Sequence, residues 1–302
     1  MRRTRTAIGA LAAGAAAICL SAPAASASYD FSFTDFTVLD NSQSRSGIGC
    51  AGDNAFAISG GAIGGGTYAD GTYVSESTPG IPGPGPNQGW TGQIDNYVGG
   101  AGSNLAHTTL TCDENGEGDY QRRHREDGVS VPDDRLGGGT LRCDGGETVV
   151  GGGNDTALNA SLEDETYLSM SAPVDARDKD KLPDDGWRVE INNDEDPNAL
   201  TTYSNLYAIF DKKLNPSYYR YVTNTARVPD GSQRVARAKC PRDEKAISGG
   251  VEVKAPYAAS MLVNSTFRAE LGERTGWVAI VDNYTTPDSK RRKFTATAIC
   301  RR

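Results

Sequence analysis

The feature that most constrains this chain is a unit of about 75 residues that occurs three times in tandem. In each copy an aspartate stands ten residues before the first cysteine, an apolar residue then leads into a Gly-Gly step, and a Gly-Trp pair follows. The opening cysteines are Cys50, Cys143 and Cys240. The three tryptophans of the chain, one in each copy, are Trp90, Trp187 and Trp277. Such a register predicts one module built three times.

Within each copy, short stretches of β-branched and aromatic residues are bounded by Gly, Pro, Asn or Asp, as in strands. No window has the 3.6-residue apolar stripe of a helix. We therefore predict an all-β protein of three tandem β-modules, packed as a compact pseudo-threefold body. The alternative is three separate small β-sandwiches.

The repeat also sets the expected boundaries. Residues 1–27 have a basic start, an apolar middle and an Ala-Ser-Ala ending, which is typical of a secretory signal peptide. After it we expect modules over 28–112, 129–210 and 219–302, joined by connectors over 113–128 and 211–218. No other apolar run is long enough to span a bilayer. The product is expected to be secreted and extracellular, with no membrane span.

Charge excludes one class of partner. Loss of the three arginines of the signal peptide takes the formal net charge from −8 to −11. An acidic chain without long clusters of Lys and Arg is a poor ligand for nucleic acid or anionic lipid. The basic clusters 122–125 and 290–293 are short, and we interpret them as solvated segments.

The spacing of the cysteines predicts two disulfide bonds. Cys50 with Cys112, and Cys240 with Cys300, would each close a loop of about 60 residues and contribute on the order of 4 kcal/mol. The second copy has Phe210 where the closing cysteine would stand, which leaves Cys143 as an odd thiol. Two fates are open for this free thiol: burial against Phe210, or a disulfide-linked dimer.

The tryptophans are expected to be structural. Along 187–191, Trp187 shares its strand face with Val189 and Ile191, whereas Arg188 and Glu190 point to the other face. This parity favours Trp90, Trp187 and Trp277 as core anchors. Stacking of a sugar on these rings is the alternative.

The segment before each Gly-Trp differs most between the copies, and binding commonly resides on loops held by a common scaffold. One is a Pro-Gly arch, one is charged and mostly acidic, and one is mixed. The candidate binding residues in these loops are Pro84, Asn87, Asp178, Lys179, Asp180, Asp184, Arg268, Glu270 and Arg274.

A weak Ca²⁺ site is suggested by alternating oxygen ligands in the first connector. The candidate ligands are Asp113, Asn115, Glu117 and Asp119. The pattern is incomplete, because His124 stands where a bidentate carboxylate is needed. No other cofactor is indicated. Neither of the two histidines lies near a nucleophile motif, so we expect no catalytic residue of that kind.

The combined pattern of Val-Pro-Asp, cysteine, Gly-Gly, Ser-x-Pro and Gly-Trp resembles a repeat of uncharacterised secreted actinobacterial proteins. Ser77 to Pro79 and Ser171 to Pro173 carry the Ser-x-Pro step, and copy three departs from it with Ser265 to Phe267. More loosely, the chain is similar to β-prism proteins of the vitelline membrane outer-layer type. That likeness implies a prism-like fold and sugar binding.

These observations favour a secreted, non-catalytic binding or adaptor protein. Its variable loops before each tryptophan would contact a glycan, a cell-wall polymer or an extracellular partner protein. The alternatives are a carboxylate-dependent hydrolase, since many acids are present, and a structural surface-coat protein crosslinked through Cys143.

Overall fold

The computed structural model describes residues 29–302 apart from 41, 53, 66–70, 81–88, 97–102, 117, 126–127, 133–134, 157–165, 176–181, 194–200, 214–215, 255–260 and 285–290. The predicted signal peptide therefore lies outside the described residues. Within them, no helix has the length and hydropathy needed to cross a membrane.

Each module supplies its strands in the same order. Module 1 contains β1 (Tyr29–Val38), β2 (Ser42–Gly49), β3 (Phe56–Ile63), β4 (Thr72–Gly80), β5 (Gly89–Asn96) and β6 (Asn104–Asp113). Module 2 contains β7 (Tyr120–His124), β8 (Val129–Val131), β9 (Arg135–Arg142), β10 (Thr148–Thr156), β11 (Thr166–Val174), β12 (Gly186–Asn193) and β13 (Thr202–Asp211). Module 3 follows the short 3₁₀-helix η2 (Pro216–Tyr218) with β14 (Tyr219–Val228), β15 (Ser232–Lys239), β16 (Lys245–Lys254), β17 (Met261–Glu270), β18 (Thr275–Asn283) and β19 (Arg292–Arg301).

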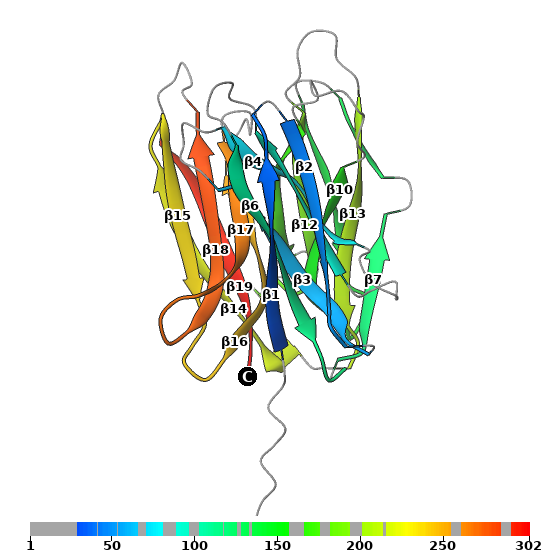
Figure 1. Ribbon diagram of the computed structural model, residues 1–302. Helices are drawn as coiled ribbons and strands as arrows, with labels where there is room; N and C mark the ends of the chain where they lie inside the picture. Colours follow the sequence, from blue (N-terminus) through cyan, green and yellow to red (C-terminus); the bar gives the residue numbers. More distant parts are fainter. Residues whose placement is uncertain are drawn as a thin grey trace, which may run out of the picture.

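These strands form three antiparallel sheets that cross the module boundaries (Figure 1). The module 1–2 sheet has the order β2-β5-β4-β10-β13-β7, with β8 beside β13. The module 2–3 sheet runs β14-β19-β16-β11-β12-β9, and the module 3–1 sheet runs β1-β6-β3-β17-β18-β15. The all-β prediction of three modules is confirmed. Since every sheet takes strands from two modules, the alternative of three separate sandwiches is excluded.

The Gly-Gly step explains why the modules can join. A Cβ on the first glycine of each pair, Gly60, Gly152 or Gly249, would overlap the tryptophan ring of the same module. A Cβ on the second, such as Gly153, would overlap the backbone oxygen of the neighbouring module's strand, here that of Ser77. One glycine therefore admits the core ring, and the other allows two modules to share a sheet.

The tryptophans are buried, with exposed fractions of 0%, 2% and 1% for Trp90, Trp187 and Trp277. Burial of the indole requires a partner for its N–H group. Trp90 Nε1 donates to Ser77 Oγ at 3.0 Å, and Trp187 Nε1 donates to Ser171 Oγ at 2.9 Å. In module 3, Trp277 Nε1 donates to Thr266 Oγ1 at 2.8 Å.

The strand register corrects the alignment of copy three. Pro79 and Pro173 lie opposite their tryptophans, and Arg268 lies opposite Trp277. The counterpart of the Ser-x-Pro step therefore begins at Thr266, one residue later than the sequence alignment placed it. A hydroxyl that accepts from the indole is the shared requirement, and threonine meets it as well as serine.

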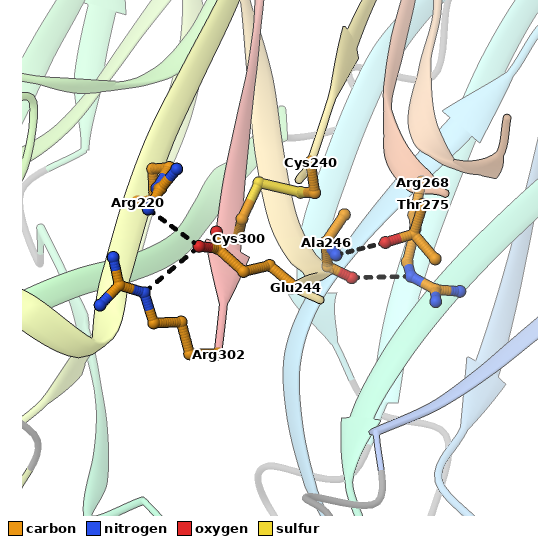
Figure 2. Close-up of a disulfide and its surroundings, with 8 residues drawn as sticks. All are labelled: Arg220, Cys240, Glu244, Ala246, Arg268, Thr275, Cys300 and Arg302. Atoms are coloured by element: carbon orange, nitrogen blue, oxygen red, sulfur yellow. Dashed lines mark hydrogen bonds and ion pairs between the residues drawn. A yellow bond between two sulfur atoms is a disulfide. The ribbon is translucent and has the colours of Figure 1, made fainter. Parts of the chain in front are cut away.

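Both predicted disulfides are present, with Cα atoms 5.9 Å apart for Cys50–Cys112 and 5.6 Å apart for Cys240–Cys300. Beside the second bridge, Glu244 is buried and lies 3.2 Å from Arg220 and 3.3 Å from Arg302 (Figure 2). These ion pairs tie the start of β14 and the end of the chain to the loop that precedes β16.

Module 2 has a noncovalent substitute for the missing bridge. Phe210 is fully buried, and the guanidinium of Arg123 lies 4.7 Å from its ring centre. Arg123 also forms an ion pair with Asp144 at 2.9 Å. Arg123 lies on β7, which falls inside the range 113–128 that was expected to be a connector. Residues 120–124 of this range form a strand that pairs with β13.

Candidate functional site

A groove crosses the outer face of the module 1–2 sheet and encloses about 520 Å³. Six strands each contribute a polar side chain to it: Arg45 from β2, Thr78 from β4, Thr91 from β5, Arg122 from β7, Asp155 from β10 and Tyr207 from β13. We call it the charged groove. Gly80, the last described residue before 81–88, also lines it. Because sheet strands hold their side chains at fixed spacing, the set is preorganised.

An ion triad joins two residues that line the charged groove, Arg45 and Asp155, to the buried Glu76. Arg45 Nη2 is 2.7 Å from Glu76 Oε1 and 3.7 Å from Asp155 Oδ1. The side chain of Glu76 is fully buried, whereas those of Arg45 and Asp155 are 40% and 30% exposed. A buried carboxylate is costly without a cation, so Arg45 stabilises the charged form of Glu76.

The environment nevertheless favours the protonated form of Glu76. Burial, and next the nearby Asp155, raise the pKa of Glu76 to about 8, whereas Arg45 acts in the opposite direction. At neutral pH the triad therefore carries one cation, one carboxylate and one acid that can donate a proton or a hydrogen bond.

Tyr207 supplies an aromatic surface. The Arg122 guanidinium carbon lies 6.0 Å from the centre of the Tyr207 ring, and the His124 ring stacks on it at 5.9 Å. Arg122 Nη1 donates to the carbonyl of Pro79 at 3.2 Å. Burial, and next Asp155, raise the pKa of Tyr207, so its hydroxyl remains a hydrogen-bond donor.

The charged groove is specific to one of three equivalent junctions. At the module 1–2 junction Ser77 pairs with Asn154, and the residues next to them in sequence are Glu76 and Asp155. At the module 2–3 junction their counterparts are Met170 and Glu252, and at the module 3–1 junction they are Ser265 and Ile63. The same scaffold therefore presents three different surfaces.

The counterpart in the module 3–1 sheet is an apolar pocket of about 260 Å³. Its lining residues are Phe31, Phe33, Ile63, His107, Thr109, Phe267, Arg268 and Ala269. His107 Nδ1 lies 2.7 Å from Asp35 Oδ1, next to this pocket. Phe31 of this pocket and Arg122 of the charged groove are equivalent residues. Each pairs with the equivalent position of the neighbouring strand in its own sheet.

The sequence-predicted loop residues are only partly described. Pro84, Asn87, Asp178, Lys179 and Asp180 lie outside the described residues. The carbonyl of Asp184 accepts hydrogen bonds from Cys143 Sγ at 3.0 Å and from Val149 N at 3.2 Å.

The three candidates in module 3 have different surroundings. Arg268 lies on strand β17, where its Nε donates to Ala246 O at 2.7 Å, and only 5% of the residue is exposed (Figure 2). Desolvation lowers the pKa of Arg268. Glu270 ends β17, and in the following turn the backbone N–H of Leu271 donates to the backbone carbonyl of Arg274 at 2.7 Å. Arg268 therefore has a packing role in addition to lining the apolar pocket.

Asp113, the first candidate Ca²⁺ ligand, is buried and accepts backbone N–H groups from Asn115 and Gly118, each at 3.2 Å. Asp119 N donates to Asp211 Oδ1 at 3.3 Å, and Glu117 lies outside the described residues. These contacts give Asp113 the geometry of a turn-forming aspartate.

No protein-family model and no curated protein matches this chain. The sequence patterns did not single out Arg45, Glu76, Asp155 or Tyr207, and Arg122 was interpreted as part of a solvated cluster. One signal was available. Glu76 is a charged residue in a stretch whose counterpart in copy two is Tyr-Leu-Ser-Met-Ser.

Proposed function

We propose that this is a secreted, non-catalytic binding or adaptor protein that holds a glycan or a cell-wall polymer in the charged groove. The observation that supports the proposal is the convergence of polar side chains from six strands on one groove. Placement on a rigid sheet lowers the entropy lost on binding.

The groove has the chemistry that sugars require. Asp155 and Arg45 offer paired acceptors and donors for neighbouring hydroxyl groups, and protonated Glu76 keeps their geometry in place. Tyr207 offers a ring against which the apolar face of a sugar packs. A concave site of about 520 Å³ suits a few sugar units better than the broad surface of a partner protein.

The test is a binding screen on the purified mature protein against immobilised glycans and cell-wall polymers, followed by calorimetry on each hit. Tyr207→Ala and Asp155→Asn should each weaken binding by about tenfold or more. The matched control is Glu252→Gln, which changes the counterpart of Asp155 at another junction and should leave affinity unchanged. Equal binding by all variants would show that the ligand does not use this groove.

A second candidate, a carboxylate-dependent hydrolase, is favoured by the raised pKa of Glu76 beside Asp155. A protonated acid next to a carboxylate is the pairing used in glycoside hydrolysis. This reading predicts that bound polymer is cleaved with release of new reducing ends, and that Glu76→Gln abolishes the release while binding persists. Polymer that stays intact after prolonged incubation would exclude the hydrolase and leave binding as the proposed function.

A further inference from the structure

The two arginines of the charged groove have different electrostatic surroundings. Arg45 faces both Glu76 and Asp155, so its charge is compensated within the protein. Arg122 donates to a backbone carbonyl, that of Pro79. Among the residues that the structure describes, no carboxylate lies within 4.0 Å of the Arg122 guanidinium.

Protonation of Glu76 increases this imbalance. The described residues that line the groove contribute two guanidinium groups and one carboxylate, that of Asp155, and with its pKa at about 8 the buried Glu76 adds no negative charge at neutral pH. Since Asp155 lies near Arg45, the positive charge in excess belongs to Arg122. A partly exposed guanidinium such as that of Arg122 attracts an anion more strongly in a groove than in bulk water, because the walls exclude solvent.

Strand pairing holds Arg122 in place. It pairs with Ile209 on β13, two residues from Tyr207, and its guanidinium carbon is 6.0 Å from the Tyr207 ring centre. At the two other junctions the equivalent residues are Phe31 and Tyr221, which pair with Thr111 and Ile299. The cation is therefore particular to this groove, and it stands beside the ring proposed to pack against a sugar.

We infer that the ligand of the charged groove is an anionic saccharide. Its carboxylate or phosphate oxygens accept hydrogen bonds from the Arg122 guanidinium, while a sugar ring packs on Tyr207. A guanidinium suits this task because its planar array of N–H donors matches an oxyanion with two parallel hydrogen bonds. The inference rests on the proposed function, since it names the ligand class for the same groove.

The experiment compares three probes of similar length by calorimetry: oligogalacturonate, neutral galactose oligomers and galactose oligomers linked through phosphodiesters. We expect at least one acidic probe to bind about tenfold more tightly than the neutral one. Comparing the two acidic probes tells a sugar carboxylate from a backbone phosphate. The Arg122→Gln variant should lose this preference, because its affinity for the acidic probes should fall much further than its affinity for the neutral oligomer. Arg122→Lys retains the charge without the planar donors, so it should retain only part of the preference.

Arg188→Gln is the matched control, because Arg188 lies on the module 2–3 sheet and pairs with Glu190. Circular dichroism and thermal melting of each variant establish that it is folded. Equal affinity for acidic and neutral probes, or an equal loss of both in Arg122→Gln, would overturn the inference and leave the proposed function standing. Absence of binding by all three probes, with a neutral hit from the screen mapping to Tyr207, would also overturn it. If no ligand maps to the groove, both proposals fail.

Discussion

The guanidinium carbon of Arg301 lies 5.0 Å from the centre of the Tyr29 ring. Arg301 is the last residue of β19 and Tyr29 is the first residue of β1, and both are buried. The end of β19 and the start of β1 lie at the same end of the molecule (Figure 1). At the junction of modules 2 and 3 the equivalent contact is a hydrogen bond from Tyr219 Oη to Asp211 Oδ2 at 2.6 Å. The Arg301–Tyr29 contact therefore closes the ring of three modules between the two ends of the described chain.

The closing contact should contribute measurably to stability. We expect Arg301→Ala to lower the free energy of unfolding by about 2 kcal/mol, because a cation–π contact away from water is lost together with packing. Urea unfolding followed by tryptophan fluorescence measures this change. Arg237→Ala is the control, since Arg237 is exposed on β15. A change for Arg301→Ala no larger than that of the control would show that the ring does not depend on this contact.

The module junction gives a sharper test of the fold. Gly153→Ala places a Cβ against the carbonyl of Ser77 in the neighbouring module, so the shared sheet must open, at a cost of about 3 kcal/mol. Gly145→Ala, in the same module, meets no atom within 4 Å and should change stability by less than about 0.5 kcal/mol. Thermal melting of the two variants makes the comparison. Similar melting temperatures would contradict the register at this junction.

Glu76 should make stability depend on pH. Its pKa rises from 4.5 to about 8 on folding, so the folded protein holds this proton more tightly than the unfolded chain. The stabilisation is complete below pH 4.5 and is lost as pH rises through about 8. Burial also raises the pKa of Asp95 and of Asp282 to about 7. These two groups therefore also lower the stability of the folded protein as pH rises.

Comparison with Glu76→Gln isolates the contribution of this one group. Between pH 5 and pH 9 we expect the wild type to lose stability relative to the variant by on the order of 3 kcal/mol. The measurement is urea unfolding at each pH. A constant difference between wild type and variant across this range would mean that Glu76 keeps one protonation state throughout.

Cys143 should react slowly in the native protein. The residue is 7% exposed, and burial, followed by Glu147, Asp184 and Asp185, raises the pKa of its thiol to about 12. We expect alkylation to be at least about a hundredfold slower than in urea. Mass spectrometry after timed quenching measures the rate. Fast labelling, or a dimer on non-reducing gels that Cys143→Ser removes, would instead support the crosslinked coat protein.

The repeat made much of the module predictable. Both disulfides and the inward side of the strand that carries Trp187 follow from local spacing, because strand alternation is a property of a few consecutive residues. The β7 strand was not predicted. Residues 120–124 form a strand because β13 pairs with them, and their composition alone resembles a polar connector.

The sequence by itself determined the class of fold, the number of modules and the residues that staple two of them. Only the tertiary structure decided which strands meet between modules, and hence that Arg45, Arg122, Asp155 and Tyr207 share one groove, with the buried Glu76 paired to Arg45. Their positions are spread over more than half of the chain. Pairing of β4 with β10 brings Gly153 against Ser77, a nonlocal contact that no local pattern of residues encodes.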